Sequence, residues 1–219
     1  MVKKKTISDT QLIDRYMDYV LEHHKSPDSV YAFAKENNME EAQFYEFFGS
    51  FKALEQQIFK TFFDNTLTVL KKSEEFQSFD ARNKLLSFYY TFFENLTANR
   101  SYVQYALKKH KNSLKGLSLL SELRKGFTAY IADLDIKTLD LKQEELEKFQ
   151  KRALQESAWI QLLLTLKFWM DDTSASFEKT DIFIEKSVNT SFDILNISPL
   201  KSVIDFGKFI YKEKIHPNN

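Results

Sequence analysis

The sequence predicts an all-α protein. Its 219 residues include only 4 Gly and 3 Pro, the residues that turns between strands most often need, whereas Phe (21) and Tyr (10) are abundant. Apolar residues recur at the three- and four-residue spacing of a helix along most of the chain. The β-branched runs separated by glycines that are typical of sheets are missing. A chain so poor in turn residues and so rich in aromatic residues is typical of long packed helices.

Short helices are expected in the first 50 residues, followed by a longer one. Ser8 and Ser50 are expected to cap the first and the fourth helix, because a serine hydroxyl accepts hydrogen bonds from the free N–H groups at a helix start. Gly49 is expected to stop the third helix. The expected segments are 8–24, 29–37 and 40–48, then a long helix that begins after Ser50.

Further helices are expected to make up the remainder of the chain. A segment whose second half is apolar almost all round, WIQLLLTLKFWM, must be buried on several sides. The last segment is amphipathic, and it either docks on the body or lies at a lipid surface. The expected helices are 85–96, 100–111, 117–134, 141–171, 176–195 and 199–215.

Composition excludes several classes of function. The 31 basic and 31 acidic side chains cancel, so no overall charge attracts nucleic acid or a membrane. There is no Cys and there are only 4 His, none in a chelating pattern, so no metal and no cofactor are expected. No phosphate loop or nucleophile elbow is found, so no catalytic residue is predicted and the protein is not expected to be an enzyme. No apolar run is long enough to span a membrane, and we expect a cytoplasmic protein.

The N-terminal segment resembles a known family of regulators. The stretch VYAFAKENNMEEAQFYEFFGSFKALEQQIF places Tyr45, Phe48, Ser50, Ala53 and Leu54 as in the TetR family of transcriptional regulators, and the similarity spans about residues 8–62. It implies a TetR-like all-α fold with a three-helix helix-turn-helix domain at 1–50 and a larger ligand-binding and dimerisation domain at 51–219. It also implies a ligand-responsive homodimer that binds DNA through residues 27–52.

The chemistry of the implied reading helix leaves two interpretations open. A helix in the major groove reads base edges with amide, hydroxyl or basic groups, between walls of phosphate. The residues suited to DNA contact are Lys4, Lys5, Gln43, Tyr45 and Lys52.

Acidic residues oppose these contacts. Glu40, Glu41 and Glu46 lie on the same stretch, and the first 60 residues hold eight Lys or Arg against ten Asp or Glu. Either the helix reads an operator, or the glutamates form a solvated surface over a core of Phe44, Phe47 and Phe48.

A second resemblance supports another function. The stretch FWMDDTSASFEKTDIFIEKSVNTSFDIL is similar both to the end of a TetR-type ligand domain and to the ubiquinone-biosynthesis accessory proteins of TetR-like fold, which hold lipids and no longer bind DNA. The residues that carry this likeness are Trp169, Asp172, Ser174, Thr180 and Phe183. The same polar residues also fit a simple helix cap at Ser174 or Ser176. The alternative function is therefore that of an accessory protein that binds a lipid or isoprenoid.

Two sets of residues in the second domain are predicted to bind partners. Bulky rings leave voids that suit a hydrophobic small molecule or lipid, although an aromatic stripe is also typical of a closed core. The predicted ligand-binding residues are Phe88, Phe92, Tyr102, Tyr105, Phe127, Tyr130, Trp159 and Phe168. The family resemblance implies a four-helix dimer seam formed by Leu162, Leu166, Trp169, Val188, Phe192 and Leu195.

Overall fold

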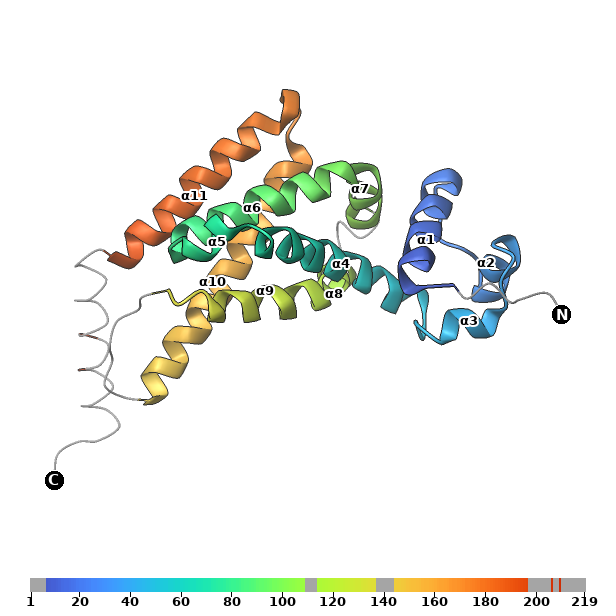
Figure 1. Cartoon of the computed structure of the whole chain (residues 1–219), viewed down its shortest axis with the longest axis horizontal. Coiled ribbons are helices and arrows are strands. Elements are labelled where there is room, and N and C mark those ends of the chain that lie inside the picture. The colour runs from blue at the N-terminus through green and yellow to red at the C-terminus, as the bar shows by residue number, and fades with distance from the viewer. Residues whose placement is uncertain (1–6, 109–113, 137–143, 197–205, 207–208, 210–219) are drawn as a thin grey trace. The chain divides into compact units, whose positions relative to one another are not determined.

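A computed structural model describes residues 7–108, 114–136, 144–196, 206 and 209 (Figure 1). These residues form helices and contain no strand, so the all-α prediction is confirmed. The helices are α1 (Asp9–His23), α2 (Val30–Glu36), α3 (Glu41–Tyr45), α4 (Phe51–Lys71), α5 (Glu74–Ser78), α6 (Ala81–Ala98), α7 (Arg100–Lys108), α8 (Leu114–Leu119), α9 (Ser121–Asp133), α10 (Glu144–Asp171), the 3-10 helix η1 (Ala175–Phe177) and α11 (Glu178–Asn196).

Helix α1 begins where its capping residue predicts. The N–H of Gln11 donates to Oγ of Ser8, and the N–H of Ser8 donates to Oε1 of Gln11, both at 3.2 Å. This reciprocal pair satisfies two backbone donors at the helix start. The helix ends at His23, and the next residue, His24, has a φ of 52°, the left-handed conformation that commonly terminates helices. The predicted limits of this helix are confirmed.

Helices α2 and α3 form a compact pair around Phe33 and Phe44, which are both fully buried. Ser29 caps α2 by accepting from the N–H of Ala32 at 3.1 Å. Helix α3 is shorter than the predicted 40–48, because the chain turns after Tyr45. Of the three residues that follow Tyr45, only Phe48 is buried in the core. Phe47 is 41% exposed, so its predicted place in the core is wrong.

Helix α4 joins this three-helix head to the rest of its unit. Ser50 caps it as predicted, accepting from the N–H of Ala53 at 3.2 Å. In its second turn the amide of Gln56 donates to the carbonyl of Ser118 at 2.7 Å and to Oγ of Ser121 at 2.9 Å. These two bonds fix α4 to the junction of α8 and α9.

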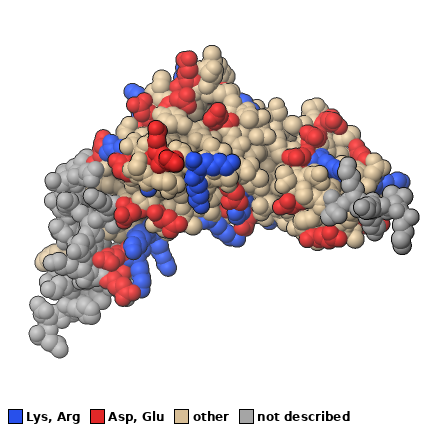
Figure 2. Space-filling model, viewed as in Figure 1, with Lys and Arg blue, Asp and Glu red and all other residues tan. Residues whose placement is uncertain are grey.

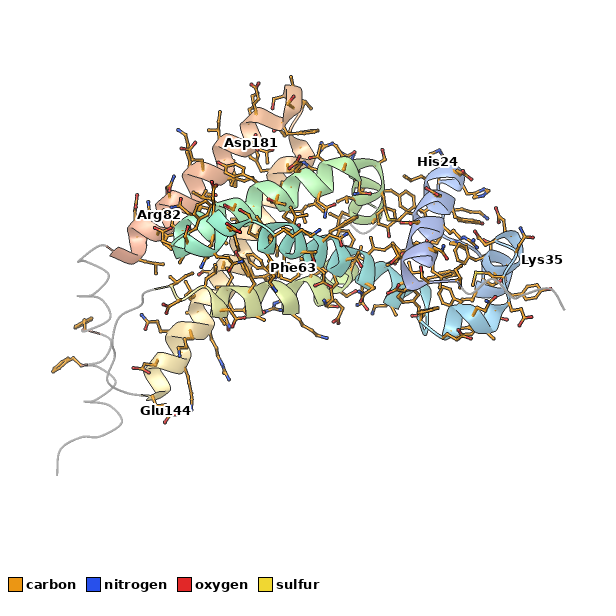
Figure 3. All side chains as sticks on the ribbon, in the orientation of Figure 1. His24, Lys35, Phe63, Arg82, Glu144 and Asp181 are labelled. Atoms are coloured by element: carbon orange, nitrogen blue, oxygen red, sulfur yellow. The ribbon has the colours of Figure 1, made fainter. Side chains whose placement is uncertain are left out.

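Further along α4, Phe63 lies against Gly126 of α9 (Figure 3). A Cβ atom built on Gly126 would come within 2.8 Å of the Phe63 ring, so the two helices pack too closely here for a larger residue. Helix α4 is therefore held by hydrogen bonds to α8 and to the first residue of α9, and by close packing to the middle of α9.

The described chain divides into two compact units. The first contains residues 1–72 and 91–127, and the second contains 73–90 and 128–219. Helices α6 and α9 each contribute to both. This division does not follow the boundary predicted at residue 50, because α1 packs on α7 and α4 packs on α8. A head that forms a domain of its own stays a prediction.

The second unit is built around α10 and α11. Trp169 of α10 and Ile184 and Val188 of α11 are fully buried. Arg82 of α6 lies beside α11 (Figure 3), donating to Oδ1 of Asp193 at 2.7 Å and to Oδ1 of Asn189 at 3.3 Å. The predicted segment 117–134 is in fact two helices, α8 and α9. Of the predicted helix 199–215, only residues 206 and 209 are described, and both are helical.

Candidate functional site

The third helix of the head begins with a bond between its own residues. The N–H of Glu40 donates to Oε1 of Gln43 at 2.9 Å, which satisfies a backbone donor at the helix start. Gln43 is half-buried. Its side-chain amide oxygen is thus engaged in the fold, and base reading by Gln43 stays a prediction.

Two other predicted DNA contacts lie nearby. Tyr45 is 51% exposed at the end of α3, but its hydroxyl donates to Oε1 of Glu41 at 3.2 Å. Its proton is therefore directed at a carboxylate and not at a phosphate. Lys52 is exposed in the first turn of α4. Lys4 and Lys5 lie outside the described residues.

Several positive charges of the head are used within the fold. Arg15 donates to the carbonyl of Asn37 at 2.9 Å and so holds the turn between α2 and α3. Lys25 forms an ion pair with Asp28 at 3.1 Å. Glu40 and Glu46 remain exposed, and acidic side chains are prominent over α1 to α3 in Figure 2. The head therefore has little surplus positive charge among its described residues.

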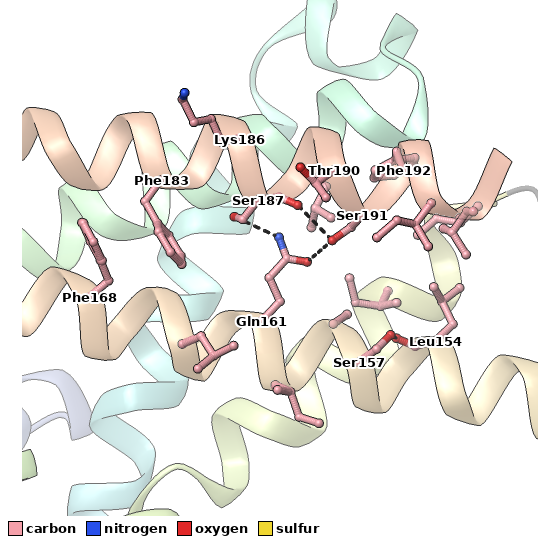
Figure 4. A pocket seen from close by; sticks show the side chains of 18 of the residues that line it. Leu154, Ser157, Gln161, Phe168, Phe183, Lys186, Ser187, Thr190, Ser191 and Phe192 are labelled. Carbon is pink, nitrogen blue, oxygen red and sulfur yellow. Dashed lines mark hydrogen bonds between the residues drawn. The ribbon is translucent and has the colours of Figure 1, made fainter. Parts of the chain in front are cut away.

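An apolar groove of about 840 Å³ runs between α10 and α11 (Figure 4). Ile160 and Leu164 of α10 are 55% and 54% exposed there, and they lie one helical turn apart. Phe168 and Phe183 stack across the groove with ring centroids 4.6 Å apart. From α11 it is lined mainly by Ile182, Phe183, Ser187, Thr190, Ser191 and Ile194.

A small polar cluster lies within this apolar surface. The amide nitrogen of Gln161 donates to Oγ of Ser187 at 3.3 Å, and Oγ of Ser191 donates to Oε1 of Gln161 at 3.0 Å (Figure 4). The same Ser191 oxygen is 2.9 Å from the carbonyl of Ser187. These bonds orient the Gln161 side chain across the groove, from α10 toward α11.

Asp172 fixes the connection between the two helices of the groove. Its Oδ1 accepts from the N–H and the hydroxyl of Ser174, at 2.8 and 2.7 Å, and its Oδ2 accepts from the N–H and the hydroxyl of Thr180, at 3.0 and 2.7 Å. Burial alone would raise the pKa of Asp172, but these four bonds outweigh it and lower the pKa from 3.8 to about 2. The first turn of α11 is thus capped twice: Ser174, one of the two predicted caps, accepts from the N–H of Lys179 at 3.2 Å, and Asp172 accepts from the N–H of Thr180.

The predicted dimer residues separate into two groups. Four are buried inside the single chain: Leu162, Leu166, Trp169 and Val188. A side chain with almost no exposed area in one chain cannot be the surface that meets a second one, so their assignment to a seam is corrected. The other two, Phe192 and Leu195, line the groove. Both sides of α10 are apolar, so periodicity indicated burial but not which side faces outward.

The predicted ligand residues are not gathered in one cavity. Only Phe168 lines the groove. Phe88, Phe92, Tyr102, Phe127 and Trp159 are buried as in a closed core. Tyr130 stacks at a tilt on Phe88 with centroids 5.1 Å apart, and its hydroxyl donates to the carbonyl of Lys84 at 3.1 Å. The eight residues are also divided between the two units, with Tyr105 in the first.

Tyr102 differs from the other buried rings. Its hydroxyl is the one buried side-chain polar atom within the described ranges that has no hydrogen-bond partner. Burial raises the pKa of Tyr102 well above its usual value, with further increases from Tyr16 and Glu55. Tyr16 donates to Oε1 of Glu55 at 2.6 Å in the same unit. A buried hydroxyl without a partner is unusual in a folded protein.

Sequence reasoning missed the exposed side of the groove. Ile160, Leu164, Ile182 and Ile194 belong to it, and Gln161 lies among them. The available signal was the single glutamine within the apolar run WIQLLLTLKFWM, since a polar residue is costly in a fully buried helix.

Comparison with known proteins identifies the class. Residues 84–210 match the family model described as tetracyclin repressor-like, C-terminal domain. The match covers more than half of the 219 residues. The chain therefore belongs to the TetR family of regulators, and the resemblance noted in the N-terminal segment is confirmed by an independent part of the chain. A search of curated proteins gave no match.

The described residues contain neither a membrane-spanning helix nor a cluster of metal ligands. No helix among them is both long and apolar enough to cross a membrane. No group of three or more His, Cys, Asp or Glu in the described ranges is arranged to hold a metal ion.

Proposed function

We propose that the chain is a ligand-responsive transcriptional regulator that acts as a homodimer in the cytoplasm and binds DNA through residues 27–52. The observation that carries this proposal is the head itself. The capped helices α2 and α3 follow α1 and lead into α4 in the order of a helix-turn-helix regulator, on a chain whose C-terminal part belongs to the TetR family.

The exposed side of α10 and α11 supports the homodimer. Half-exposed Ile160, Leu164, Ile182 and Ile194 border one continuous groove. An apolar surface of this kind on a helical protein is stable in water when another surface covers it. A second copy supplies the same shape and the same chemistry, as a twofold interface requires.

The fixed position of α4 supports a response to ligand. Its Gln56 is bonded to Ser118 of α8 and Ser121 of α9, and its Glu55 is bonded to Tyr16 of α1. A small molecule that displaces α8 or α9 would therefore move α4, and with it the reading helix of each copy. The partnerless hydroxyl of Tyr102 supports a ligand that combines an apolar body with one polar group.

Binding to labelled DNA from around its own gene, at 50 and 200 mM salt, tests the proposal. A site-specific reader should bind at nanomolar concentration at the lower salt and lose affinity steeply as salt rises, because it displaces counterions from several phosphates. Weak binding that is equal for scrambled DNA would contradict DNA reading.

A second candidate is an accessory protein of the same fold that binds a lipid or isoprenoid and does not read DNA. It is favoured by one observation: the polar groups of α3 are directed at each other, since Gln43 accepts from Glu40 and Tyr45 donates to Glu41. Native mass spectrometry of freshly purified protein distinguishes the two. A co-purified apolar compound together with no specific DNA binding would favour the accessory protein.

A further inference from the structure

The groove between α10 and α11 contains one feature that association alone does not require. Its surface is almost wholly hydrocarbon, yet Gln161 lies in the middle of it, held by Ser187 and Ser191. Replacing the three residues by apolar ones would give a more hydrophobic surface that associates more strongly. A polar group retained in such a place needs a reason beyond affinity.

The hydrogen bonds within the cluster leave one N–H group of Gln161 without a partner among the described residues. Oε1 of Gln161 accepts from Ser191, and one N–H of its amide donates to Ser187. An amide nitrogen has two N–H groups, so one donor of Gln161 has no partner among the described residues. In the uncovered groove, water satisfies this donor. When a second copy covers the groove, only an acceptor on that copy can do so.

We propose that Gln161, held in place by Ser187 and Ser191, fixes the register in which two copies of this chain pair. This inference rests on the proposed homodimer. Across a twofold axis each copy presents the same cluster, so the two clusters meet in one alignment of the helices. A slip by one helical turn moves them apart by about 5.4 Å along each helix. Where the slip brings the free donor of each Gln161 against side chains such as Leu164 or Ile194, that donor is buried unpaired.

The difference in free energy between the aligned and the slipped dimer is large enough to decide which of them forms. Burying one unpaired polar group lowers the population of a state by roughly 5- to 150-fold, and a slipped dimer buries two. Hydrocarbon contacts cannot supply this preference, because Ile160, Leu164 and Phe168 repeat at every turn and fit a shifted partner nearly as well. A single buried polar residue sets register in coiled coils by the same means.

The absence of Cys from the chain provides a direct test. Four full-length variants, Ser157→Cys, Ile160→Cys, Leu164→Cys and Phe168→Cys, each place one thiol along the groove. A disulfide between two copies forms where their Cα atoms approach within about 7 Å. With Gln161 present, oxidation should link one position, or two neighbouring ones, at least roughly 10-fold more efficiently than the others. In the background Gln161→Leu, the yields should become similar at three or four positions, while the dimer remains as tight or tighter.

Two further variants make the result interpretable. Gln57→Leu makes the same chemical change on α4, outside the groove, and should leave the linkage profile sharp. The double variant Ser187→Ala with Ser191→Ala keeps Gln161 but removes its two hydrogen-bond partners, and should broaden the linkage profile. If Gln161→Leu does not fold, this double variant decides whether the cluster sets the register.

The possible failures are distinguishable. A profile as sharp in Gln161→Leu as in the parent would overturn the register proposal and leave the homodimer standing. Linkage at no position, together with a monomer in analytical ultracentrifugation, would overturn the homodimer and the register proposal together.

Discussion

Replacing Asp172 by Asn should lower the free energy of unfolding by about 2 kcal/mol. The carboxylate accepts four hydrogen bonds, two on each oxygen, from Ser174 and Thr180. Asparagine keeps one accepting oxygen, and its NH₂ group cannot accept, so two bonds are lost. Thr180 is almost completely buried. Two lost bonds at roughly 1 kcal/mol each give the expected total.

The pKa of Asp172 gives a second route to the same magnitude. A carboxyl whose pKa is 3.8 when unfolded and about 2 when folded stabilises the fold by roughly 2 kcal/mol at neutral pH. Because the folded pKa is the lower one, this contribution is complete above the unfolded pKa and is lost as pH falls through the folded pKa. About half of it should be gone by pH 3. The stability difference between the parent and Asp172→Asn should shrink accordingly.

Urea unfolding followed by tryptophan fluorescence measures both effects, since Trp169 is buried beside this connection and lies 6.3 Å from the ring of Phe177. Asp171→Asn is the matched control, because that neighbouring carboxylate is exposed, and it should change stability by less than about 0.5 kcal/mol. A loss below that value in Asp172→Asn, or a difference that is the same at pH 6 and pH 3, would refute the reasoning.

Three other variants test other parts of the molecule. Leu164→Glu buries two carboxylates in the proposed homodimer and should weaken it by roughly 100-fold or more in sedimentation equilibrium. The double change Glu40→Ser with Glu41→Lys should raise affinity for DNA and steepen its salt dependence by about one unit in the logarithmic slope, measured by fluorescence anisotropy. Gly126→Ala forces a methyl group against Phe63 and should cost about 1 to 2 kcal/mol in urea unfolding, because overpacking exceeds the gain in helix propensity.

Each of these has a distinct contradicting result. Val69→Glu adds a charge at a similarly exposed position on α4 and should leave association unchanged; an equal effect from Val69→Glu and Leu164→Glu would remove the groove from the interface. If the glutamate changes leave DNA affinity unaltered, the start of α3 does not face the duplex. If Gly126→Ala is neutral or stabilising, α4 and α9 adjust more easily than their packing indicates.

Local chemistry made the limits of the first helices predictable. Ser8 and Ser50 accept the hydrogen bonds that their positions predict, because capping depends on residues within three positions of the helix start. The helix 40–48 was predicted too long, since its end depends on how Phe44 and Phe48 both reach one core. That core is made by residues distant in the sequence, which no local pattern contains.

The candidate sites were less predictable than the fold, for a physical reason. On α10, Leu162 and Trp169 face inward while Ile160 and Leu164 face outward. All four are apolar, and hydrophobic periodicity cannot say which apolar side meets its own chain and which meets another surface. The aromatic residues posed the same difficulty, since Phe88 and Phe127 belong to closed cores although their composition also fits a pocket.

The central claim is that two copies of this chain read DNA together, and selection from a pool of random duplexes tests it most directly. The full-length protein is used to retain duplexes over several rounds at 150 mM salt, and the retained DNA is sequenced. A twofold dimer with one reading helix in each copy predicts an inverted repeat whose half-sites lie about one helical turn, or a multiple of it, apart. Retained sequences that share no motif would contradict the claim.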